Sequence, residues 1–140
     1  MKVLLVEPGK TARPAEIGEG LHELQKVVGG TIQALYPWPD PVALVCYDEG
    51  KLIGLPLNRA LEDYDIIAGT FFICGVQGAD FVSLNDRQLE TYQKKFQRPE
   101  IIIDSPYGIM VCRCSEREYA AVQEKVHHRD THPQKKQDYE

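Results

Sequence analysis

The chain has 140 residues, of which 43% are hydrophobic and 26% charged, and its formal net charge is −5 at pH 7. This length and composition predict one globular domain with its own core, and they exclude a wholly disordered chain. Acidic residues are spread along the sequence, so the chain lacks the basic face of a general nucleic-acid-binding protein.

The sequence gives no sign of a membrane or secretory segment. No run approaches the roughly 18 apolar residues of a transmembrane helix. The first six residues, Met1–Val6, are too short for the core of a signal peptide. We therefore expect a cytoplasmic protein whose four cysteines are reduced thiols.

In the first third of the chain, a strand is predicted at 2–6 and a short returning strand at 15–17. An apolar stripe predicts a helix over 19–28, which two glycines end because Gly readily takes the left-handed cap conformation. Alternation then predicts a strand at 31–36.

The middle of the chain carries the strongest apolar runs. Residues 41–47 and 52–57 flank the segment Asp-Glu-Gly-Lys, which predicts a β-hairpin. A third strand is predicted over 64–76. Short connections place these three strands side by side in one sheet.

After this sheet, Asn85 and Gln88 predict a capped helix over 86–96. Strands follow at 100–104 and 109–114, and the pair Ser115 and Glu118 forms a second capping box. The fold class is therefore α+β, a mixed and mostly antiparallel sheet with two or three helices in a β-grasp-like arrangement. The predicted core is Val3, Leu5, Leu24, Ile32, Val42, Leu44, Leu55, Ile67, Phe72 and Leu89.

The predicted organisation has three parts. Residues 1–98 form the core, residues 99–132 a strand and helix extension packed on it, and residues 133–140 a frayed tail.

Asn58 and Arg59 stand where an apolar strand ends, a usual place for groups that contact a ligand. Arg can hold phosphate or carboxylate with two hydrogen bonds. The structural alternative is that Arg59 pairs with a nearby carboxylate of Glu62, Asp63 or Asp65 while Asn58 caps a turn.

Gly69 and Thr70 lie inside the apolar segment 64–76, which is otherwise typical of a buried strand. An interior Gly predicts a bulge or the close approach of a ligand or backbone, and the alternative is packing opposite Trp38 or Tyr36. The candidate residues for binding a partner or ligand are Trp38, Asn58, Arg59, Gly69 and Thr70.

Cys112 and Cys114, followed by His128 and His132, form the one group that resembles a metal site. Their Cys-x-Cys spacing departs from the usual zinc pattern, so we expect no metal and no cofactor. The alternative places both cysteines in the core and the histidines at a solvated helix end. No catalytic signature is present, so an enzyme is not expected.

Six separated segments resemble a known family, and they occur in this order: Met1-Lys-Val-Leu-Leu-Val-Glu-Pro-Gly9, Val28-Gly-Gly-Thr-Ile32, Asp48-Glu-Gly-Lys51, Gly54-Leu-Pro-Leu-Asn-Arg59, Asp65-Ile-Ile-Ala-Gly-Thr-Phe-Phe-Ile73 and Ser83-Leu-Asn-Asp86. The chain resembles, over about residues 1–96, a family of small proteins known only as a domain of unknown function. Such proteins are common in phages and conjugative elements of Gram-positive bacteria.

The resemblance implies an accessory role in a mobile element and carries over no catalytic residues. We expect a non-catalytic protein that binds and blocks a host defence component, as anti-CRISPR or anti-restriction proteins do, in the cytoplasm of the bacterial host. The alternative is a small-molecule binder that sequesters a phosphate-containing nucleotide signal through Asn58, Arg59 and the segment Gly69-Thr70. The sequence leaves the oligomeric state open.

Overall fold

The computed structural model describes residues 1–62 and 65–130. Within them, six strands form one sheet in the order β2-β1-β7-β4-β3, with β8 paired to β7, and two further two-stranded sheets are β5–β6 and β9–β10. The strands are β1 (Lys2–Val6), β2 (Arg13–Glu16), β3 (Ile32–Leu35), β4 (Val42–Tyr47), β5 (Leu57–Leu61), β6 (Asp65–Ala68), β7 (Phe71–Gln77), β8 (Asp80–Val82), β9 (Glu100–Ser105) and β10 (Gly108–Arg113). The helices are α1 (Leu21–Val28), α2 (Asp86–Phe96) and α3 (Glu116–Asp130).

The strand pairings are antiparallel, so the predicted α+β class and mostly antiparallel sheet are confirmed. This strand order does not confirm the β-grasp-like arrangement. No helix in the described ranges is long and apolar enough to span a membrane.

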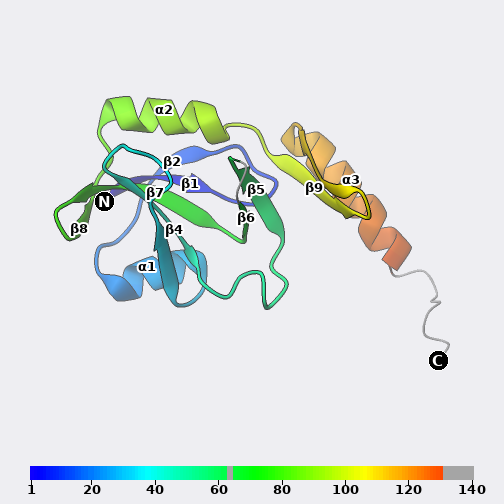
Figure 1. Cartoon of the computed structure of the whole chain (residues 1–140), viewed down its shortest axis with the longest axis horizontal. Helices are drawn as coiled ribbons and strands as arrows, with labels where there is room; N and C mark the ends of the chain where they lie inside the picture. The colour runs from blue at the N-terminus through cyan, green and yellow to red at the C-terminus, as the bar shows by residue number, and fades with distance from the viewer. Residues whose placement is uncertain (63–64, 131–140) are drawn as a thin grey trace.

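The six-stranded sheet has a helix on each face, with α2 on one side and α1 on the other (Figure 1). Side chains alternate along β7, because Phe71 and Ile73 pack on the α2 side while Phe72 and Cys74 pack on the α1 side. The two central strands, β4 and β7, are therefore buried on both faces. This explains their uninterrupted apolar sequences.

The predicted core divides into fully and partly buried members. Six residues are buried, namely Val3, Leu24, Val42, Leu44, Ile67 and Phe72. The other four, Leu5, Ile32, Leu55 and Leu89, are half-buried.

Capping residues in the sequence correctly predicted the starts of α2 and α3 and the end of α1. The Asn85 side chain accepts from the Gln88 backbone N–H (2.8 Å), and the Gln88 side chain accepts from the Asn85 N–H (3.0 Å). Ser115 and Glu118 make the same reciprocal pair before α3. Helix α1 ends as predicted at a left-handed Gly29 but begins at Leu21, and β2 begins two residues earlier than expected.

The predicted central hairpin is wrong. β4 pairs with β3 and β7, whereas β5 pairs with β6 in a separate sheet. Residues 51–54 form turns that leave Leu52 86% exposed, and the strand begins only after Pro56. The predicted strand over 64–76 is also two strands, since Gly69 takes φ +82° and breaks the run between β6 and β7. Strand β8 was not predicted.

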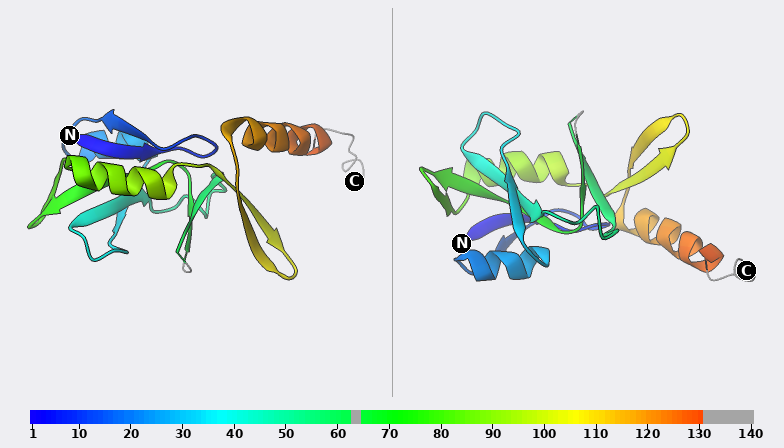
Figure 2. Two further views of the ribbon diagram at one scale, coloured as in Figure 1. Left: turned by 90° about the horizontal axis from the view of Figure 1, so that it is seen from above. Right: turned by 60° about the horizontal axis from the view of Figure 1, so that its bottom comes forward.

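Beyond α2, the hairpin β9–β10 and helix α3 extend away from the six-stranded sheet and diverge from each other (Figure 2). The first turn of α3 contacts the loop between β1 and β2. Glu116 accepts a hydrogen bond from the Thr11 N–H (2.8 Å), and the Tyr119 ring covers Gly9. These contacts attach the base of the C-terminal segment to the sheet.

Candidate functional site

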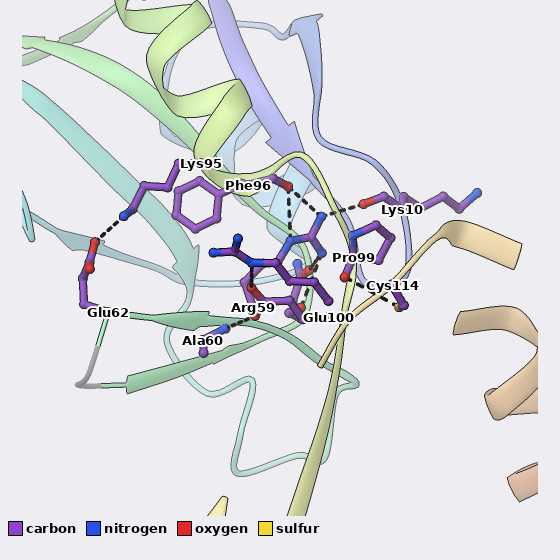
Figure 3. Close-up of polar contacts among 11 residues, drawn as sticks. Lys10, Arg59, Ala60, Glu62, Lys95, Phe96, Pro99, Glu100 and Cys114 are labelled. Carbon is purple, nitrogen blue, oxygen red and sulfur yellow. Dashed lines mark hydrogen bonds and ion pairs between the residues drawn. The ribbon is translucent and has the colours of Figure 1, made fainter. Parts of the chain in front are cut away.

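Arg59 lies in β5, and its side chain is completely buried. Nε and Nη2 donate to the carbonyl oxygen of Phe96 (3.3 and 2.9 Å), and Nη2 also donates to the carbonyl oxygen of Lys10 (2.7 Å; Figure 3). Nη1 donates to the side-chain oxygen of Asn58 (2.8 Å) and to its carbonyl oxygen (3.4 Å). A guanidinium has five N–H groups, so these contacts leave none for a ligand.

The predicted pairing of Arg59 with a nearby carboxylate is wrong for the two acidic residues that the structure describes. Glu62 pairs with Lys95, and Asp65 pairs with Lys51, while Asp63 lies outside the described residues. Burial lowers the pKa of Arg59 to about 10, and the nearby charge of Glu100 opposes this shift.

Asn58 is also completely buried, and it links three segments of chain. Its amide donates to the carbonyl oxygens of Val6 (3.0 Å) and Gly69 (2.8 Å), while its oxygen accepts from Arg59. Asn58 therefore holds the break between β6 and β7 beside β1. It does not cap a turn.

Gly69 meets Leu55, because a Cβ added to Gly69 would lie 2.7 Å from a Leu55 methyl carbon. The expected packing opposite Trp38 or Tyr36 is therefore replaced by packing on Leu55. Thr70 is half-buried between β6 and β7. Its predicted binding role stays a prediction.

Trp38 joins the group through aromatic contacts. Its ring centroid lies 4.8 Å from that of Tyr92 and 5.9 Å from that of Phe96. Its indole N–H donates to Glu62 (3.2 Å). Because Phe96 also accepts from Arg59, four of the five predicted residues, Trp38, Asn58, Arg59 and Gly69, are connected through contacts in one buried cluster that reaches the end of α2.

A cleft of about 570 Å³ opens beside this cluster, between β5, the end of α2 and the β9–β10 hairpin. Glu100 is nearly buried there, and it accepts from the Ala60 backbone N–H (2.8 Å). The cleft is lined by Ala60, Glu62, Lys95, Phe96, Glu100, Val111 and Arg113.

The charges of this cleft are balanced. Lys95 pairs with Glu62 (Figure 3), and Arg113 Nε lies 3.9 Å from Glu100 Oε2. The second pair is longer than a hydrogen bond, so the Arg113 guanidinium is held only loosely.

The β9–β10 hairpin exposes large apolar side chains. Tyr107 at its turn is 98% exposed, and Ile103, Ile109, Met110 and Val111 are exposed along the two strands. They lie on both faces of the hairpin, and such a concentration of exposed apolar side chains is typical of a binding surface. The hairpin and the adjoining cleft are therefore the candidate site.

The comparisons with known proteins give one finding. A model of the family described as "Domain of unknown function (DUF3846)" matches residues 1–97. The chain belongs to this family. A search of curated proteins found no match to the chain, and a search of solved structures also found none.

The DUF3846 match ends at residue 97, one residue after α2. The cluster around Arg59 therefore lies inside the DUF3846 region, apart from the nearby Glu100. The β9–β10 hairpin lies outside it, and the cleft has one wall in each part.

Of the four metal-site candidates, the structure describes the side chains of the two cysteines. Cys112 is exposed and Cys114 is buried, so the expectation of two core cysteines on one strand face is wrong for Cys112. His128 lies in α3, and His132 lies outside the described residues. No group of three potential metal ligands occurs within the described ranges.

Sequence reasoning did not select the hairpin residues. A signal was present, since Ile101-Ile-Ile103 and Ile109-Met-Val111 lack the alternation of a strand with one solvated face. Such strands are expected to be covered on both faces. The structure instead leaves much of this surface open, with Ile101 and Ile102 half-buried and Ile103 exposed.

Proposed function

We propose that the protein is a non-catalytic binding protein that contacts another protein through the β9–β10 hairpin. The observation that carries this proposal is the concentration of exposed apolar side chains there. Nine large hydrophobic residues are exposed in the described part of the chain, and five of them lie in or at the turn of this hairpin. Burial of such residues is the main favourable term in most protein association.

The proposed partner is a component of host defence, such as a CRISPR or restriction system, in the cytoplasm of a bacterial host. The likeness to small proteins of phages and conjugative elements supports this context. The net charge of −5 supports a protein partner over direct contact with nucleic acid.

The nucleotide-binding alternative loses Asn58 and Arg59, the two side chains that were expected to hold the phosphate. Arg59 and Asn58 are completely buried, and their N–H donors are directed at protein acceptors. A phosphate group would have to displace these bonds to reach the guanidinium. No observation therefore favours this alternative over protein binding.

Two matched isoleucines test the proposal. Ile109 in the hairpin is 54% exposed, and Ile53 in the turn after β4 is 56% exposed. Ile109→Asp and Ile53→Asp therefore place the same charge at two equally exposed positions. Neither substitution should lower the melting temperature by more than a few degrees, because surface changes usually cost about 0.5 kcal/mol or less.

The assay measures the efficiency with which a phage or plasmid enters cells that carry a defined defence system. Wild type and Ile53→Asp should protect the incoming DNA, and Ile109→Asp should not. Affinity capture with the same three proteins should recover a defence component that depends on Ile109. Equal protection by the two variants would contradict the proposal, as would protection by none of the three proteins across the systems tried.

A further inference from the structure

Strand β10 has a free edge. The β9–β10 register runs without a bulge from the pair Glu100 and Arg113 to the pair Ser105 and Gly108. In the described part of the chain, β10 pairs with β9 alone. Every second residue of an antiparallel strand directs its N–H and C=O away from its partner, so the outer edge of β10 presents unpaired backbone groups.

This edge lacks the features with which proteins usually prevent strand addition. Its sequence, Gly-Ile-Met-Val-Cys-Arg, contains no proline, no lysine and no acidic residue. Residues directly opposite each other share a face, so Ile103 and Met110 lie on one face and Ile102 and Val111 on the other. The edge is therefore apolar on both sides.

The segment that follows the described residues does not suit this edge. Residues 131–140 (Thr-His-Pro-Gln-Lys-Lys-Gln-Asp-Tyr-Glu) contain no Ala, Val, Leu, Ile or Met, so they lack the alternating apolar side chains of a matching strand. A second copy fits poorly, because antiparallel pairing with full overlap of the two β10 strands places the turn Pro106-Tyr-Gly108 of one copy beside Arg113 of the other. That turn has no carboxylate.

Arg113 indicates the charge of the strand that would fit. Its side chain is 68% exposed, and its one ionic contact in the described residues is the 3.9 Å approach to Glu100. Lys95 stands in the same cleft but already pairs with Glu62, which leaves Arg113 as the more accessible cation. An acidic side chain beside Arg113 could accept hydrogen bonds from its Nη groups, since guanidinium binds carboxylate with paired, charge-assisted hydrogen bonds.

We infer that the β10 edge binds an extended segment of the partner protein as an added strand. This segment carries apolar residues at alternate positions and an Asp or Glu beside Arg113. Main-chain hydrogen bonds supply affinity in this mode, and alternate side chains supply specificity. The inference rests on the proposed function, since it states how the hairpin contacts its partner.

The test is a selection of random twelve-residue peptides on the full-length protein. Wild type should enrich peptides with alternating apolar residues and an acidic residue at a fixed offset. Arg113→Glu should keep the apolar pattern and replace the acidic residue with Lys or Arg, with each peptide preferring its matched protein about tenfold or more. Arg117→Glu, at an exposed position of α3, is the control and should select the same peptides as wild type.

Amide hydrogen exchange tests strand addition itself. With a selected peptide bound, alternate backbone amides of β10 should exchange at least tenfold more slowly than in the free protein. Unchanged β10 exchange, or an enriched motif whose charge does not follow residue 113, would overturn the inference. Dimers of the free protein with β10 amides already protected would also overturn it, in favour of a second copy.

The two proposals fail separately. If Ile109→Asp abolishes anti-defence activity while β10 exchange and the selected charge are unaffected, protein binding stands and strand addition is wrong. If peptides bind β10 with the predicted charge reversal but activity does not depend on Ile109, the edge binds strands and the proposed function is wrong.

Discussion

Arg59 donates two hydrogen bonds to the carbonyl oxygen of Phe96, the last residue of α2. The final carbonyls of a helix have no partner within the helix, and they carry its negative dipole end. A buried guanidinium at this point satisfies one of these groups and offsets the dipole. The same side chain reaches Lys10, so it ties the β1–β2 loop to the end of α2.

We predict that Arg59→Ala lowers the free energy of unfolding by at least about 3 kcal/mol. Hydrogen bonds to a charged group contribute about 1.5–3 kcal/mol each, and their loss would leave buried carbonyl oxygens unpaired. Urea titration measures this change. Arg59→Lys should recover only part of the loss, because an ammonium cannot reproduce the planar set of five donors.

Arg13→Ala is the matched control for this change. The Arg13 side chain is 56% exposed and pairs with Glu7 on the surface (3.3 Å). Exposed ion pairs contribute about 0–1 kcal/mol, so this variant should be close to wild type. If the two variants unfold at the same urea concentration, the structural role of Arg59 is wrong.

The sequence singled out Asn58 and Arg59 correctly as unusual, but it could not show what they do. Apart from the bonds between the two residues themselves, their partners are the backbone oxygens of residues 6, 10, 69 and 96. Every residue type has a backbone oxygen, so no pattern of side chains in the sequence could predict these contacts. Among the nearby acidic residues, Glu62 and Asp65 looked like partners, but Glu62 pairs with Lys95 and Asp65 with Lys51.

For the fold as well, the sequence predicted local features correctly and long-range contacts poorly. Helix caps depend on residues three positions apart, and both predicted capping boxes are present. The pairing of β4 with β7 joins segments about 30 residues apart, with two strands between them. A short turn sequence after β4 favoured a local hairpin. The apolar central strands instead pair with each other, since that places both in the middle of the sheet.

Gly9→Ala should destabilise the protein more than Gly54→Ala does. Both glycines have positive φ, +77° and +78°, and Ala in this conformation costs roughly 1–2 kcal/mol. A Cβ on Gly54 meets open space, whereas one on Gly9 would lie 2.5 Å from Tyr119 Cε2. Overpacking of this kind costs about 1–3 kcal/mol more.

Urea titration of the two variants measures the difference. Tyr119→Ala in the Gly9→Ala background should remove most of the extra loss, because the clash disappears. An equal cost for Gly9→Ala with and without Tyr119 would mean that the ring does not cover Gly9.

Cys112 should be the one cysteine that reacts quickly with a thiol reagent in the native protein at pH 8. Cys46, Cys74 and Cys114 are buried. Burial raises the pKa of Cys46 to about 11 and that of Cys74 to about 12, and it raises the pKa of Cys114 as well. Since the thiolate is the reactive form, these three should react only on unfolding.

The reaction is followed as the number of cysteine thiols modified per protein molecule with time. Native protein should show one fast thiol and denatured protein four, and Cys112→Ser should remove the fast phase. Two fast thiols in the native protein would place a second cysteine at the surface.

The contact between Glu62 and Lys95 should make stability depend on pH in the acid range. The hydrogen bond from Lys95, with a smaller contribution from Trp38, lowers the pKa of Glu62 from its ordinary value of 4.5. A carboxylate with a lowered pKa in the folded state stabilises the protein above pH 4.5. This contribution is lost as the pH falls through the folded-state pKa, because the unfolded chain then binds more protons.

Glu62→Gln should therefore be less stable than wild type at pH 7, and the difference should shrink below pH 4.5. The difference at pH 7 should be no more than about 1 kcal/mol, because Glu62 is partly exposed and solvent screens its charge. Urea titration at pH 7, 5, 4 and 3 gives the four differences. Glu90→Gln, which removes an exposed carboxylate of α2, controls for the loss of one negative charge. A Glu62→Gln stability difference that stays constant from pH 7 to pH 3 would mean that Lys95 does not lower the pKa of Glu62 in the folded protein.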